Sequence, residues 1–102
     1  MPFIDLSSLE LKDFRPGVKS WAHLGEHLIM AVMTIEEEKV DSGHTHPYEQ
    51  AGVVLEGIFT LTLNGETKPL GPGQGYFIPA GIHHAWSITR GPVRILDVSA
   101  KM

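Results

Sequence analysis

Two pairs of histidines, His44 with His46 and His83 with His84, are the residues of this sequence best suited to chemistry. They hold four of the chain's six histidines, and the chain has no cysteine. Side chains at positions i and i+2 of a strand point to the same face, so the first pair would project together. Imidazole is a common protein ligand for zinc, nickel, copper and iron. The pattern therefore indicates a site for a divalent metal ion.

The residues around the two pairs indicate which other side chains could belong to the same site. Gln50 has the same parity as the first pair if the chain between them stays extended, whereas Glu49 faces the other way. Only one of the adjacent His83 and His84 can face the same side, and parity alone leaves that choice open. The alternative is that these are separate surface histidines. The second pair follows a Pro-x-Gly turn at 79–81, and a second cluster in such a context favours the metal site.

Composition limits the chain to one small domain and excludes several classes of function. Its 102 residues are 42% hydrophobic, enough for one core, and the net charge of −4 comes with no run of lysine or arginine that would bind nucleic acid. No segment has the roughly 18 consecutive apolar residues of a membrane span. The N-terminus lacks the pattern of a signal peptide, which together with the missing cysteines predicts a cytoplasmic protein.

Short apolar segments separated by glycine and proline turns predict an all-β fold. Asn64-Gly65 is typical of a tight hairpin, because both residues tolerate positive φ. The acidic run 36–38 is interpreted as a solvated strand end, and helical periodicity is weak apart from a single turn near 7–11. The predicted strands are 27–38, 50–56, 58–64, 66–70, 76–79, 83–89 and 93–99.

The two clusters resemble the two motifs of the cupins, a family of small jelly-roll β-barrels. The first motif is G-x5-H-x-H-x3-E-x6-G and the second is G-x5-P-x-G-x2-H-x3-N. The residues that match the first, within about 43–57, are His44, His46, Gln50 and Gly57. Those that match the second, within about 73–88, are Gly73, Pro79, Gly81 and His84. The resemblance implies one cupin domain over 1–102, a jelly-roll barrel also called a double-stranded β-helix.

This sequence departs from the family pattern at three positions. Glu38 stands at the first glycine and Ile88 at the final asparagine, and both positions shape turns or strand ends. Gln50 stands at the glutamate and is similar to the HxHPxEQ variant of small bacterial cupins, in which the amide oxygen binds the metal. The resemblance thus implies four ligands and leaves His83 outside the set. The implied ligands are His44, His46, Gln50 and His84.

Such a ligand set is electrically neutral, so the bound ion would keep its full +2 charge. It would polarise carbonyl oxygens and attract anions more strongly than a site with a carboxylate ligand. The expected cofactor is one divalent transition metal ion: zinc, nickel, manganese or iron. The common iron oxygenase triad of two histidines and a carboxylate is incomplete here, although all-histidine iron sites also occur among cupins.

A catalyst also needs an acid or base beside the bound substrate. Asp97 in the last strand and Tyr48 between the ligands are the candidate catalytic residues. Small cupins that open the ring of unsaturated uronates carry a last-strand "DVF", where this chain has "DVS" with Ser99 at the aromatic position. A solvated strand aspartate is the alternative for Asp97. Tyr76 and Trp86 are interpreted as core-filling residues.

Three functions fit this sequence. The first is a metal-dependent enzyme that acts on a small oxygenated substrate, sugar-like, uronate-like or carbonyl, by isomerisation, ring opening, lyase or dioxygenase chemistry. The second is a module that binds or senses a small ligand such as a sugar, and the third is a barrel with a structural metal. The expected partners are a small molecule and a second copy of the chain, but no nucleic acid or membrane. A homodimer is expected because 28–35 and the N-terminal strand would leave exposed edges.

Overall fold

The computed structural model describes residues 3–36, 39–88 and 90–101. Glu38 and part of the acidic run 36–38 lie outside these ranges. Within them, one 3-10 turn, η1 (Leu6–Ser8), precedes the strands. The strands are β1 (Lys12–Arg15), β2 (Val18–Leu24), β3 (Leu28–Ile35), β4 (Lys39–His44), β5 (Gln50–Glu56), β6 (Phe59–Leu63), β7 (Glu66–Leu70), β8 (Gly75–Ile78), β9 (His84–Ile88) and β10 (Val93–Ala100).

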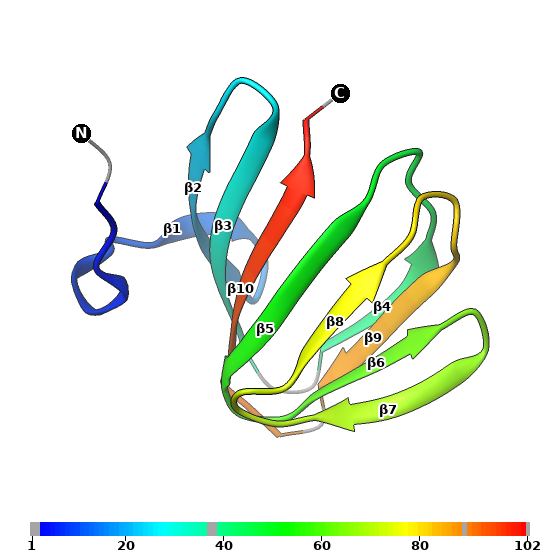
Figure 1. The fold of residues 1–102 in the computed structure, drawn as a ribbon. Coiled ribbons are helices and arrows are strands. Elements are labelled where there is room, and N and C mark those ends of the chain that lie inside the picture. The colour runs from blue at the N-terminus through cyan, green and yellow to red at the C-terminus, as the bar shows by residue number, and fades with distance from the viewer. Residues whose placement is uncertain (1–2, 37–38, 89, 102) are drawn as a thin grey trace.

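These strands form two antiparallel sheets that face each other (Figure 1). The larger sheet has the order β1-β2-β3-β10-β5-β8, and the smaller has the order β4-β9-β6-β7. Neighbouring strands are mostly far apart in sequence, as when β10 lies between β3 and β5. The chain thus adopts the all-β jelly-roll architecture that its turn spacing and motifs predict.

Alternation along the strands places one face of each sheet in the core. In β10, Val93, Ile95 and Asp97 point inward in turn, so a carboxylate continues a row of buried apolar residues. Between β6 and β7, Asn64 at φ 47° and Gly65 at φ 87° make the tight hairpin that their types predict. The buried core cluster consists of Val18, Ile35, Val54, Phe59, Leu61, Leu70, Ile88, Val93 and Ile95.

The N-terminal part differs from the sequence-based prediction. The predicted strand 27–38 corresponds to β3, which ends at Ile35 and belongs to the larger sheet, and the next strand, β4, begins at Lys39 in the smaller sheet. An N-terminal strand was expected without bounds, and the structure has two there, β1 and β2, whose polar residues mask any alternation. The predicted turn near 7–11 occurs slightly earlier, at η1.

The order of strands also determines which segments lie at an edge of the larger sheet. β3 pairs with β2 on one side and β10 on the other, so segment 28–35 is internal. The expectation that this segment leaves an edge is wrong, whereas the N-terminal strand β1 does lie at an edge, as expected. Across residues 3–36, 39–88 and 90–101, we find no helix long and apolar enough to cross a membrane.

Candidate metal centre

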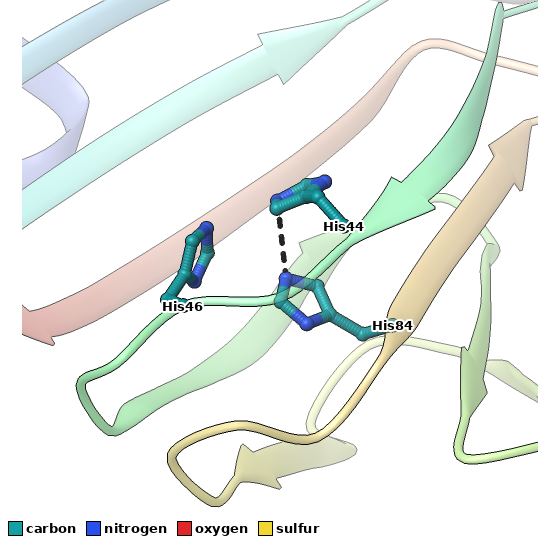
Figure 2. Close-up of side chains that lie close together, drawn as sticks. All are labelled: His44, His46 and His84. Carbon is teal, nitrogen blue, oxygen red and sulfur yellow. Dashed lines mark hydrogen bonds between the residues drawn. The ribbon is translucent and has the colours of Figure 1, made fainter.

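Three histidines converge between the two sheets (Figure 2). His44 ends β4 and is paired directly with His84, the first residue of β9. His46 follows two residues after His44, where the chain leaves the sheet. The ring centroid of His44 lies 4.6 Å from that of His46 and 4.3 Å from that of His84. One ligand nitrogen from each ring can be chosen so that all three lie within 4.8 Å of one another, so the three side chains could hold one metal ion.

Contacts at the far side of two rings orient their nitrogens. His84 Nδ1 lies 3.1 Å from the carbonyl oxygen of Ile82, to which it can only donate. His44 Nδ1 lies 3.4 Å from a carboxylate oxygen of Asp41. Both contacts favour a proton on Nδ1 and leave a lone pair on Nε2. The two Nε2 atoms are 3.1 Å apart, and two nitrogens each about 2.0–2.1 Å from one ion at a right angle are about 3 Å apart. This pair therefore fits a shared metal ion.

Gln50 reaches the same cavity from the opposite sheet, as the first residue of β5. The chain bends at Pro47 and Tyr48, so the extended path assumed in the parity argument is absent. The Gln50 amide nitrogen donates to Asp97 Oδ2 at 2.9 Å, which turns the amide oxygen away from that carboxylate. This oxygen is buried and makes no hydrogen bond of good geometry among the described residues, although the His46 side chain interacts with Gln50. A buried acceptor without a donor costs about 1–3 kcal/mol, and a metal ion would satisfy it.

The orientation of Gln50 depends on a row of three paired residues. Asp97 of β10, Gly52 of β5 and Tyr76 of β8 stand opposite one another in register. A Cβ on Gly52 would lie 2.4 Å from the Tyr76 hydroxyl oxygen, so only glycine lets that side chain cross the strand. The hydroxyl donates to Asp97 Oδ2 at 2.5 Å. One carboxylate oxygen thus receives two donors, and neither Gln50 nor Asp97 can rotate freely.

Burial and neighbouring charges shift three pKa values in this cluster. Burial raises the pKa of Asp97, which is 5% exposed, while the hydrogen bonds from Tyr76 and Gln50 oppose that rise. Burial and the nearby Asp97 carboxylate raise the pKa of Tyr76. Burial first, and then the two other imidazoles of the cluster, lower the pKa of His46. A neutral imidazole is the form that binds a metal ion.

The histidines open into a cavity of about 540 Å³ between the sheets. Both candidate catalytic residues, Asp97 and Tyr48, line it, and the Tyr48 ring is stacked on His46 at 4.5 Å and 6°. His83 and Glu49 are exposed and do not line it. The polar and charged lining residues are Arg15, Asp41, His44, His46, Tyr48, Gln50, Tyr76, His84, Trp86, Asp97 and Ser99.

The sequence of this barrel matches a known family. A family model described as Cupin domain matches residues 31–99, so the chain belongs to the cupin family. A 53-residue part, 51% of the chain, is 48% identical to the HTH-type transcriptional regulator PuuR of Escherichia coli (strain K12). The match covers 29% of that regulator, so the chain corresponds to less than a third of it.

Solved structures support the fold. KdgF from Halomonas sp. superposes with a TM-score of 0.89 at 21% identity, over 100% of this chain and 94% of that one. An RmlC-like cupin from Shewanella frigidimarina NCIMB 400 gives a TM-score of 0.86 at 22% identity, over 98% and 90%. At these identities the likeness establishes the fold alone.

Several residues at the cavity were not selected from the sequence as site residues, among them Tyr76, Phe14 and Arg15. Tyr76 was interpreted as core-filling, and it does pack against the core, but its hydroxyl also binds Asp97. Phe14 and Arg15 line the cavity from β1, a strand whose bounds were not predicted. Gly52, which stands opposite Tyr76, is visible in the sequence. Its role in letting Tyr76 reach Asp97 follows only from the order of β8, β5 and β10, which no local pattern predicts.

Proposed function

We propose that this cupin is a divalent-metal-dependent enzyme that acts on a small oxygenated substrate, such as a sugar, a uronate or a carbonyl compound. The Gln50 side chain is the observation that supports this most, because its oxygen is buried, makes no hydrogen bond of good geometry among the described residues, and lies on the cavity of the three histidines. A ligand set of His44, His46, His84 and the Gln50 oxygen would account for that atom. Once bound, the metal ion would polarise a substrate oxygen.

Asp97 is the candidate acid or base. It faces the same cavity, and its raised pKa brings proton exchange closer to neutral pH. Its Oδ2 is engaged by Gln50 and Tyr76, which leaves Oδ1 to take a proton from a substrate carbon and return it to a neighbouring atom. This role favours isomerisation, ring opening or elimination. Dioxygenation is less well supported, because the carboxylate ligand of the common iron triad is missing.

Tyr48 is placed to orient groups at the site. Its ring is stacked on His46 and is half-buried at the cavity wall. This contact restrains the imidazole and places the phenol within the space that a substrate would occupy. We propose that Tyr48 orients both His46 and the substrate.

Elemental analysis of the natively purified protein, followed by turnover assays with the metal it contains, tests this function. The substrates are a set of keto-sugars, unsaturated uronates and dicarbonyls, each assayed with wild type and with Asp97→Asn. We expect about one divalent ion per chain and a substrate whose turnover falls at least about 100-fold in the variant. A protein that binds no divalent ion would contradict the proposal, and so would turnover that is unchanged in the variant.

A ligand-sensing module is the second candidate, and one observation favours it. The part of the chain that resembles PuuR is 48% identical to that transcriptional regulator. A sensor would bind a small molecule in the same cavity and release it unchanged. Tight binding of a sugar or uronate to the metal-loaded protein, with no product detected by mass spectrometry after prolonged incubation, would favour this candidate over the enzyme.

We also propose a cytoplasmic homodimer. The unpaired edge of β1 and the exposed apolar side chains Leu24 of β2 and Leu28 of β3 would be covered by a second copy. Light scattering at micromolar concentration tests the assembly, and a mass of one chain would contradict it. Fractionation of the source cells tests the location.

A further inference from the structure

The mouth of the metal cavity carries a side chain to which the proposed chemistry assigns no role. Among the lining residues that the structure describes, Arg15 is the only lysine or arginine. It is half-exposed, with 50% of its side chain accessible, so its guanidinium can meet both the cavity and an incoming molecule. A guanidinium offers five donors in a planar fork that matches a carboxylate.

A β-bulge directs this side chain into the cavity. In β1, Asp13 pairs with Lys19 and Arg15 with Val18, so the register shifts and Phe14 is the extra residue. Consecutive residues of a regular strand point to opposite faces, yet Phe14 and Arg15 both line the cavity. Bulges of this kind re-aim side chains and are common beside functional sites.

The contacts of Arg15 leave most of its donors available. One guanidinium nitrogen lies 3.9 Å from Asp41 Oδ2, the limit of an ion pair, and the guanidinium carbon lies 5.8 Å from the centre of the Phe14 ring. The other oxygen of Asp41 accepts from the Gly43 amide at 2.8 Å and lies 3.4 Å from His44 Nδ1. The Asp41 carboxylate therefore lies between the Arg15 guanidinium and the His44 imidazole. A small molecule with two polar groups can span this distance.

We propose that Arg15, with Phe14, forms an anion subsite at the cavity mouth, and that the substrate or ligand carries a carboxylate besides the oxygen that faces the histidines. This inference rests on the proposed metal-dependent function. One guanidinium beside the Asp41 carboxylate matches a single negative charge, which favours a carboxylate over a phosphate dianion. Both residues lie outside the matched family region, 31–99, so the N-terminal segment supplies this selectivity.

Calorimetric titration of the zinc-loaded protein with matched diacids and half-amides tests the subsite. The probes are succinate and glutarate, and succinamate and glutaramate, in which one carboxylate becomes a neutral amide. Wild type should bind at least one diacid about tenfold more tightly than its half-amide. Arg15→Gln should abolish that preference and leave half-amide binding unchanged, whereas Arg15→Lys should retain part of it.

Lys12→Gln is the matched control, because it removes the same charge from the same strand at a residue that does not line the cavity. Its affinities should equal those of wild type. Zinc titration of every variant comes first, and a wild type that binds no zinc would contradict the proposed function itself. With zinc bound, equal diacid preference in Arg15→Gln and Lys12→Gln would overturn the anion subsite alone. Failure of both diacids to bind zinc-loaded wild type would overturn it as well.

Discussion

Replacing Gln50 with glutamate converts a hydrogen bond into a contact between two carboxyl groups. In the wild type the Gln50 amide nitrogen lies 2.9 Å from Asp97 Oδ2 and donates to it. The variant places an acceptor oxygen at that position, in a cluster where Asp97 is 5% exposed. Before any metal binds, Gln50→Glu should therefore destabilise the protein, and the loss should depend on pH.

The distance gives the size of this loss. Two negative charges 2.9 Å apart repel by about 6 kcal/mol at an effective dielectric constant of about 20. Binding one proton costs less, about 3.7 kcal/mol at pH 7 for a carboxyl with an ordinary pKa near 4.3. The free energy of unfolding should thus fall by about 4 kcal/mol at pH 7 and by about 1 kcal/mol at pH 5. At pH 7 this lowers the melting temperature by about 15–30 °C.

Thermal unfolding of chelator-treated protein, followed by circular dichroism at pH 7 and pH 5, measures the loss. Gln74→Glu is the control, because Gln74 is exposed and its side-chain oxygen accepts from the Gly71 amide, as a carboxylate also can. It should change the free energy of unfolding by less than about 0.5 kcal/mol. Zinc should raise the melting temperature of Gln50→Glu by more than that of wild type, because the positive ion offsets the repulsion between the two carboxylates.

Two results would refute this reasoning. An unchanged melting temperature at pH 7 would mean that Gln50 does not donate to a charged Asp97. An equal loss at pH 7 and pH 5 would mean that packing, rather than the two carboxyl groups, accounts for the destabilisation.

Three further predictions concern the same cluster. Calorimetry should show that His84→Ala lowers zinc affinity more than about 100-fold, whereas the exposed His83→Ala changes it less than about twofold. The lowered pKa of His46 means that the unfolded imidazole binds protons that the folded one does not, so metal-free stability should fall as pH drops below 6.5. In urea unfolding between pH 5 and 8, the free energy of unfolding should depend less steeply on pH in His46→Gln than in wild type. An equally steep dependence would mean that His46 is not the group responsible. Tyr76→Phe removes one donor to Asp97 and should cost about 1–2 kcal/mol in urea unfolding; no loss would mean that this hydrogen bond is not formed.

The sequence predicts the strands that carry strong local signals. Segments 50–56 and 66–70 match β5 and β7 in both bounds. The first is a mainly apolar run that ends at Gly57, and the second follows the Asn64-Gly65 turn. β1 and β2 lack such a pattern, and no local signal shows that β3 and the following β4 belong to different sheets. That difference depends on which strands pair, and local patterns do not specify the pairing.

The candidate site shows the same limit. The position of His84 on the cavity follows from motif spacing, and His44 and His46 do lie together as their spacing predicts. The parity argument for Gln50 assumed an extended chain, but the chain bends and Gln50 approaches from the other sheet. Its contact with Asp97 spans 47 residues, so only the placement of β5 beside β10 reveals it.

Side-by-side zinc titrations of Gln50→Ala and Glu49→Ala test most directly whether the three imidazoles and the Gln50 oxygen hold the metal. The two residues are adjacent, but only Gln50 lines the cavity. Gln50→Ala should weaken zinc binding by at least about tenfold, and Glu49→Ala should match wild type. If Glu49→Ala loses the metal while Gln50→Ala keeps it, the proposed ligand set is wrong.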